Sequence, residues 1–185
     1  HEEEDDKVRP LEELINIYLN SVGGNATFLL NIPPTKDGLF HENDVKRLKE
    51  LGDFIRHAFA KNLLNDAELA VSSFMRGYGI DNVREDNYLK YFRTDDGITE
   101  AVIDITWENE QLIRYIVMKE NINCSQRVES FRIEANLGEE YKTVYDGTVI
   151  GYKRIAPLTP LVTDKIRIRI LDSRVAPTLS FIGVY

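Results

Sequence analysis

The sequence has little cysteine and little histidine. Cys124 is the one cysteine among 185 residues, so no disulfide can form within the chain and a zinc site built on cysteine thiolates is excluded. The three histidines, His1, His41 and His57, are too scattered to indicate a histidine cluster. We therefore predict no metal site and no cofactor.

Basic residues and long apolar runs are also scarce. Lys and Arg together number 23 against 31 Asp and Glu, which leaves a net charge of −8. A general nucleic-acid binder needs a basic surface to contact phosphates, so this class is excluded. No apolar run approaches the roughly 20 residues of a membrane-spanning helix. Nothing in the sequence resembles a signal peptide.

The first third of the chain has helical periodicity on both sides of a short apolar run. Residues 10–22 and 43–60 carry apolar side chains at spacings of three and four, which predicts two amphipathic helices. Between them, residues 26–32 are apolar on both faces, which is typical of a buried strand in a parallel sheet. The order helix, strand, helix indicates part of a β/α repeat that needs further neighbours.

After about residue 62 the pattern changes to short runs rich in Ile, Val and Tyr. Residues 101–106, 112–118, 131–135 and 165–170 read as strands, with turns at 95–97, 137–138 and 146–147. Residues 165–170 alternate strictly between Ile and a base. This pattern predicts an antiparallel β-sandwich, and we place the boundary between the two domains at residues 62 and 63.

Several motifs, in order and spacing, resemble one family of enzymes. Asn-Ile-Pro-Pro at residues 31–34 is the most distinctive of them. The chain resembles the α-L-fucosidases of glycoside hydrolase family 29, and the subgroup that acts on 1,3/1,4-linked fucose. The matching segments are residues 11–14, 18–25, 29–34, 37–39, 44–52, 126–131, 150–154 and 172–174.

The resemblance implies a mixed α and β protein. Residues 1–62 would be the last helix-strand-helix of a catalytic (β/α)8-like barrel, and residues 63–185 a discoidin-like, galactose-binding-like jelly roll. The activity implied is exo-acting hydrolysis of terminal α-L-fucose from glycans with retention of configuration. The partners implied are a fucosylated glycan and the upstream barrel segment, and the location implied is the periplasm or the cell exterior.

No catalytic residue is expected within this chain. A retaining glycosidase needs two carboxyl groups about 5–5.5 Å apart, and in the family both lie upstream of the stretch that begins here. We therefore interpret the chain as a C-terminal fragment, inactive alone. The resemblance places His1 and Asn31 at the rim of the substrate site, because the carboxyl ends of barrel strands line the active site.

In the predicted sandwich, Trp107, Arg127, Arg154 and Arg174 are candidates for contacts with a glycan or with the barrel. For the arginines we favour a structural role, and aromatic residues of a small sandwich mostly fill its core. A structural calcium ion is not predicted, because the acid that such domains carry near the C-terminus is absent. Two alternatives to an enzyme piece stay open: a carbohydrate-binding module and a purely structural sandwich.

Overall fold

The computed structural model describes residues 7–138 and 140–185. The chain divides into two compact units between Ala60 and Lys61, and each unit is described by itself. None of the helices in the described part is long and apolar enough to cross a membrane.

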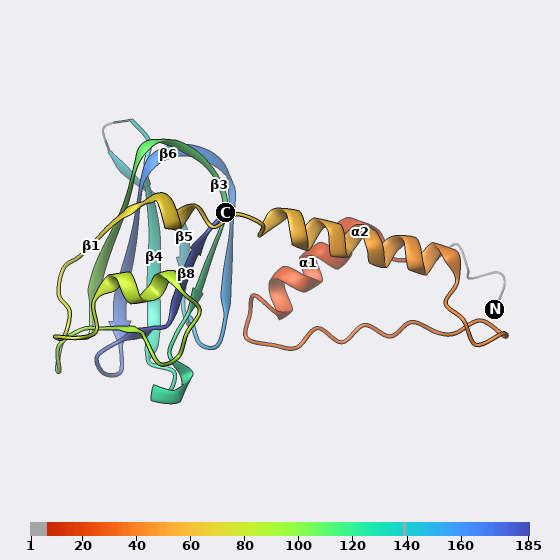
Figure 1. Ribbon diagram of the computed structural model, residues 1–185, viewed down its shortest axis with the longest axis horizontal. Helices are drawn as coiled ribbons and strands as arrows, with labels where there is room; N and C mark the ends of the chain where they lie inside the picture. Colours follow the sequence, from red (N-terminus) through yellow and green to blue (C-terminus); the bar gives the residue numbers. More distant parts are fainter. Residues whose placement is uncertain (1–6, 139) are drawn as a thin grey trace. The chain divides into compact units, whose positions relative to one another are not determined.

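The N-terminal unit contains two helices joined by an extended segment (Figure 1). Helix α1 spans Leu11–Ser21 and helix α2 spans Glu42–Ala58, which confirms both predicted helices. Leu14 of α1 and Leu51 of α2 are buried. At the start of α2, the ring nitrogen Nδ1 of His41 accepts a hydrogen bond of 3.3 Å from the backbone N–H of Asn43, which caps the helix.

The predicted buried strand at residues 26–32 is absent. This stretch is extended but carries no strand assignment, and Leu29 is 82% exposed. The physical reason is that a strand is defined by hydrogen bonds to a neighbouring strand, and the described residues of this unit supply none. The local sequence favours an extended backbone here, whereas the hydrogen bonds of a β-sheet require a neighbouring strand.

The C-terminal unit is an antiparallel β-sandwich, as the alternating pattern predicts. The order in the main sheet is β1-β3-β6-β4-β5, with β8 also paired to β3, while β2 and β7 form a separate pair. The strands are β1 Glu68–Val71, β2 Phe92–Arg93, β3 Ala101–Lys119, β4 Val128–Asn136, β5 Tyr141–Gly147, β6 Arg154–Ser173, β7 Thr178–Leu179 and β8 Phe181–Val184. The described residues of this unit also form three short 3-10 helices: η2 Leu63–Asp66, η3 Ile80–Arg84 and η4 Ile122–Cys124.

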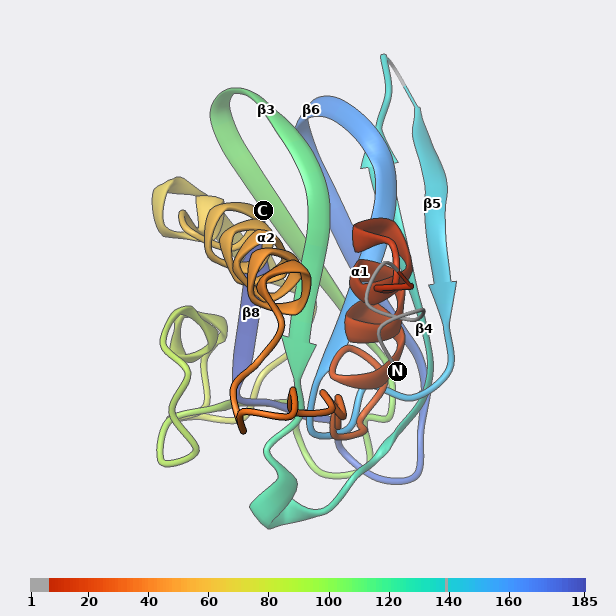
Figure 2. The same ribbon diagram turned by 90° about the vertical axis from the view of Figure 1, so that its right-hand side faces the viewer.

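The two longest strands, β3 and β6, contribute to both layers of the sandwich. Residues 101–106 of β3 pair with residues 165–170 of β6, and residues 111–118 pair with 154–163. Between these sections the register shifts, and the paired ribbon curves (Figure 2). A bulge that leaves residues unpaired on one strand bends the ladder, so a single pair of strands can form parts of two layers.

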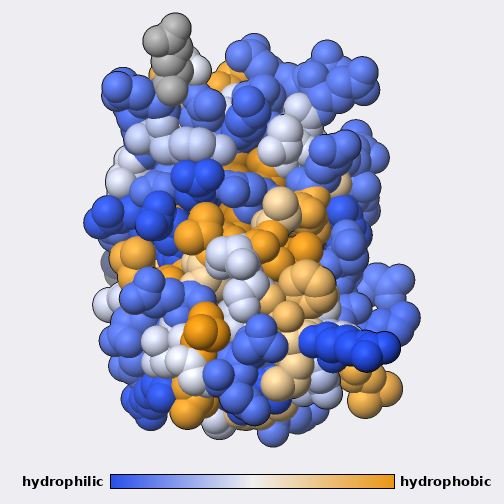
Figure 3. All heavy atoms as spheres, turned by 90° about the vertical axis from the view of Figure 1, so that its left-hand side faces the viewer, coloured by the Kyte–Doolittle hydropathy of each residue, from blue (hydrophilic) through white to orange (hydrophobic). Residues whose placement is uncertain are grey.

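The core of the sandwich consists mainly of Ile side chains. Ile166, Ile168 and Ile170 of β6 are at most 1% exposed, so the strict alternation at residues 165–170 is confirmed. On the opposite face, the guanidinium of Arg167 donates two hydrogen bonds to the carboxylate of Asp104, at 2.7 and 3.2 Å. Figure 3 shows one face of the sandwich, where hydrophobic side chains gather near the middle and hydrophilic ones surround them.

The turn predicted at Asp146-Gly147 is wrong. Both residues belong to β5, and Gly147 is paired with Phe131 of β4. A glycine within a strand often marks a close approach of another group, and here that group is the ring of Phe131. The predicted turns at residues 95–97 and 137–138 lie outside strands, and Gly97 and Gly138 have φ angles of 82° and 97°.

Candidate functional site

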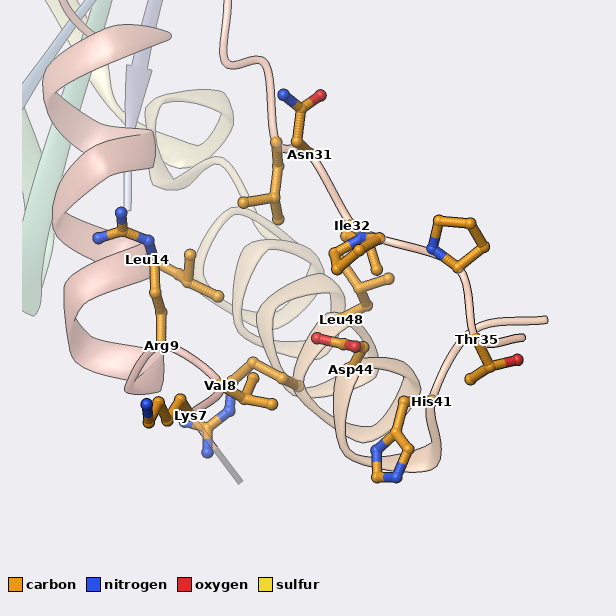
Figure 4. A pocket seen from close by; sticks show the side chains of 14 residues that line it. Lys7, Val8, Arg9, Leu14, Asn31, Ile32, Thr35, His41, Asp44 and Leu48 are labelled. Atoms are coloured by element: carbon orange, nitrogen blue, oxygen red, sulfur yellow. The ribbon is translucent and has the colours of Figure 1, made fainter. Parts of the chain in front are cut away.

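A cavity of about 310 Å³ lies in the N-terminal unit, between the two helices and the extended segment. Figure 4 shows Leu14 of α1 and Leu48 of α2 along its sides and Asp44 at the start of α2. The residues that line it are Lys7, Val8, Arg9, Leu14, Leu30, Asn31, Ile32, Pro33, Pro34, Thr35, His41, Asp44, Arg47 and Leu48.

Among the described residues that line this cavity, Asp44 is the one carboxylate, and Lys7, Arg9 and Arg47 are basic. Two carboxyl groups about 5–5.5 Å apart are required for retaining glycoside hydrolysis. The polar groups that line the cavity suit an anion or a polar ligand, and its described lining residues include one carboxylate of the two that such hydrolysis requires. Within the described part of the chain, no group of three or more His, Cys, Asp or Glu residues is placed to hold a metal ion.

Of the two residues predicted at the rim of a substrate site, the structure describes one. His1 lies outside the described residues. Asn31 is exposed at the edge of the cavity, and its side-chain amide is turned away from α2 (Figure 4). An amide in this position is accessible to a ligand.

Trp107 lies in the core of the sandwich. It is 4% exposed, and its indole Nε1 donates a hydrogen bond of 2.8 Å to the backbone carbonyl of Leu63. A sugar needs an accessible ring face for stacking, and Trp107 offers almost none in this position. Its hydrogen bond instead connects the bend of β3 to η2.

The three arginines of the family-like motifs bind groups of the sandwich itself. The guanidinium of Arg127 donates to the backbone carbonyls of Cys124 and Ala176, at 2.9 and 2.7 Å. Arg154 donates to the carbonyl of Val149 at 2.9 Å, and Arg174, which is exposed, pairs with Glu129. These bonds connect loops to strands, and they already use some of the N–H donors of each guanidinium.

Sequence reasoning missed a cluster of charged and aromatic side chains in the sandwich. The ammonium of Lys119, at the end of β3, pairs with Asp86 and lies 5.7 Å from the ring centroid of Tyr152 and 5.9 Å from that of Phe181. Lys153 is near enough to Lys119 that the charge of Lys119 acts on its pKa. The residues come from four separate segments, so no local motif contains them together.

The comparisons with known proteins cover both units. A family model described as α-L-fucosidase matches residues 1–58. α-L-fucosidase 1 of Arabidopsis thaliana is 32% identical over 185 residues, a match that covers 96% of this chain and 36% of the relative. The chain therefore spans little more than a third of the length of this curated relative.

Solved structures agree with this match. A Bacteroides thetaiotaomicron structure assigned to the α-L-fucosidases has a TM-score of 0.94 and 30% identity, covering 100% of this chain and 41% of that one. A glycoside hydrolase family 29 fucosidase of Ruminococcus gnavus, solved in complex with fucose, has a TM-score of 0.88 and 32% identity, covering 96% of this chain and 37% of that one. The chain corresponds to the C-terminal portion of the family 29 α-L-fucosidases.

A more distant likeness concerns the fold alone. A chitosan-binding module from Paenibacillus has a TM-score of 0.59 and 15% identity, and the match covers 67% of this fucosidase-like chain and 97% of that module. The β-sandwich is therefore an architecture that also occurs as a separate module.

Proposed function

We propose that this chain is the C-terminal part of an exo-acting, retaining α-L-fucosidase that removes terminal α-L-fucose from glycans. The observation that carries the proposal is that its likeness to family 29 fucosidases extends over nearly the whole chain, through both units. A relative with 32% identity was solved in complex with fucose, which supports a fucosylated substrate.

In this proposal the two units support a catalytic centre that lies upstream. The cavity of the N-terminal unit has a single carboxylate among its described lining residues, whereas the reaction requires a pair. The extended segment at residues 25–41 exposes Leu29, Leu39 and Phe40. Burial of these side chains against the upstream segment would be favourable, at about 25 cal/mol for each Å² of apolar surface removed from water.

The test compares the chain alone with the chain joined to its own upstream segment. Residues 1–185 alone are expected to release no 4-nitrophenol from 4-nitrophenyl α-L-fucoside, because proton-transfer catalysis alone is typically worth about 10²–10⁴ in rate. The longer protein is expected to release fucose, and proton NMR of the first product should show the retained configuration. Turnover by residues 1–185 that is lost in Asp44→Asn would contradict the proposal and place the active site in this chain.

The same experiment addresses Asn31. As a rim residue that contacts the substrate, Asn31 should affect KM and kcat/KM of the longer protein when it is replaced by Ala. The matched control is Asn20→Ala on α1, whose side chain bonds the backbone carbonyl of Asn16 one turn earlier. Equal kinetic constants for Asn31→Ala and the unmodified enzyme would exclude the rim role.

A further inference from the structure

The cluster around Lys119 and Tyr152 is supported by buried hydrogen bonds. Glu120 is fully buried, and its carboxylate accepts hydrogen bonds from the backbone N–H groups of Gly151 at 2.6 Å, Arg127 at 2.7 Å and Val128 at 3.0 Å. The backbone N–H of Glu120 donates in return to the carbonyl of Gly151 at 2.9 Å. Lys119 directly precedes Glu120, and Tyr152 directly follows Gly151. The hydrogen bonds of Glu120 therefore fix the backbone that carries the side chains of Lys119 and Tyr152.

The cluster brings basic side chains together in a chain whose net charge is −8. Lys119 and Lys153 contribute two ammonium groups, and Asp86 contributes one carboxylate. Burial lowers the pKa of Lys153, the charge of Lys119 lowers it further, and Asp86 opposes both effects. A second negative charge at this place would favour the charged form of Lys153. Burial raises the pKa of the Tyr88 and Tyr185 phenol groups, and the negative charge of Asp86 raises it further, so both phenols are neutral at pH 7.

Tyr152 adds an accessible aromatic surface to this charge. Its side chain is 55% exposed, although Lys119 lies over its ring. Solvent-exposed aromatic rings next to hydrogen-bond donors are well suited to ligands with one apolar face and polar edges. A pyranose has this form, because its axial C–H bonds make a face while its hydroxyl groups point outward.

We propose that Tyr152, Lys119 and Lys153 form a binding site for a negatively charged sugar unit of a glycan, with a carboxylate or a sulfate ester as the charged group. The ring of Tyr152 stacks on the pyranose face, and the two ammonium groups bind the anion. Asp86 accepts a hydroxyl hydrogen bond and orients Lys119. All of these residues lie in the C-terminal unit, and the test below measures binding and not the release of fucose.

A nucleic acid strand could also combine stacking with anion binding, but the observations favour a sugar. A polyanionic strand contacts several phosphates and depends on an extended basic surface, whereas this cluster offers two lysines within an acidic chain. A lone inorganic anion would make no use of the exposed ring. The two alternatives are therefore distinguishable by experiment.

The test is an NMR titration of residues 1–185, labelled with ¹⁵N, in which amide shifts are followed. The probes are methyl galacturonide, methyl galactoside 6-sulfate and the neutral methyl galactoside, followed by sodium sulfate and a thymidine oligonucleotide. The expected result is saturable shifts around residues 119, 152 and 153 with at least one of the two anionic sugars, and much smaller shifts with the neutral one. A response to one anionic sugar alone would identify its charged group as the one recognised.

Two variants and two matched controls test the roles of the residues. Tyr152→Ala and Lys153→Gln should each weaken binding of the anionic sugar about tenfold, which corresponds to about 1.4 kcal/mol. Phe74→Ala removes an aromatic side chain of similar exposure, 51%, and Lys142→Gln removes an exposed lysine of β5. Neither control should alter the affinity. Unchanged amide spectra away from the substituted residue will show that each variant is folded.

Four results would overturn the proposal. They are no saturable shift with either anionic sugar, equal shifts with the neutral sugar, equal affinity for sodium sulfate, and tighter binding of the oligonucleotide. Affinity that is unaffected by both Tyr152→Ala and Lys153→Gln would also overturn it, because binding would then occur elsewhere. Weaker binding at higher ionic strength is expected, since the screening length falls from about 30 Å at 0.01 M to about 8 Å at 0.15 M.

Discussion

Gly147 lies directly against the aromatic ring of Phe131. A Cβ atom at Gly147 would lie 2.3 Å from Cζ and 2.4 Å from Cε1 of that ring. The two residues are opposite one another in the ladder between β5 and β4, and Phe131 is fully buried and stacked on Tyr145 with centroids 5.9 Å apart. The absence of a side chain at residue 147 thus gives space to one of the largest residues of the core.

Replacing Gly147 by Ala should therefore destabilise the sandwich. Overpacking a core typically costs about 1–3 kcal/mol, and Phe131 has no room to move because it is buried. Trp107 is the one tryptophan of the chain and lies in the core of the sandwich, so its fluorescence during urea unfolding reports this unit. The double variant Gly147→Ala with Phe131→Leu should cost less than the sum of the two single variants. Strictly additive costs would show that the two positions are not in contact.

Glu120→Gln should destabilise the sandwich although the change is nearly isosteric. Gln replaces one acceptor oxygen by a donor NH₂ group, so at least one of the three backbone N–H groups loses its acceptor. An unsatisfied buried group costs about 1–3 kcal/mol. The control is Glu129→Gln, which removes the charge of a carboxylate that pairs with the exposed Arg174; exposed pairs are worth about 0–1 kcal/mol. Equal losses in urea unfolding for the two variants would refute the role of Glu120.

Residues 61–185 should fold without the N-terminal unit. The buried cluster of the sandwich contains residues from Leu64 to Val184 and none from α1 or α2. The side-chain oxygen of Asn62 accepts hydrogen bonds from the backbone N–H groups of Leu64 at 3.0 Å and Val184 at 2.9 Å. A chain that begins at residue 63 loses these bonds and should be less stable than residues 61–185, by about 1–3 kcal/mol. A non-cooperative urea transition for residues 61–185 would show that the sandwich depends on the helices.

The lowered pKa of Lys153 should be detectable in the pH dependence of the free energy of unfolding. The pKa of Lys153 in the folded chain is lowered, chiefly by burial. At pH values between that pKa and the ordinary lysine value, Lys153 binds more protons in the unfolded chain than in the folded one. The contribution of Lys153 to the free energy of unfolding should therefore rise with pH across this window. Lys153→Met should remove that rise, whereas Lys142→Met, on an exposed residue of β5, should keep it. Identical pH profiles for Lys153→Met and the unmodified chain would contradict the shifted pKa.

Patterns over a few residues predicted much of the local structure. The apolar spacing of residues 10–22 and 43–60 indicated both helices, and the alternation at residues 165–170 indicated which side of β6 faces the core. These features depend on side-chain periodicity within one element. The same local reasoning predicted a strand at residues 26–32, where the described unit has only an extended segment, because a strand also needs a partner that lies elsewhere.

The sequence by itself determined the helices, the alternating strands and, through its motifs, the likeness to family 29 fucosidases. Only the tertiary structure decided that Trp107 is a core residue, that Gly147 makes space for Phe131, and that Lys119 meets Tyr152. Each of these depends on contacts between residues far apart in the chain. Periodicity shows which face of an element is apolar, but the register and the bends of the strands decide which side chains meet.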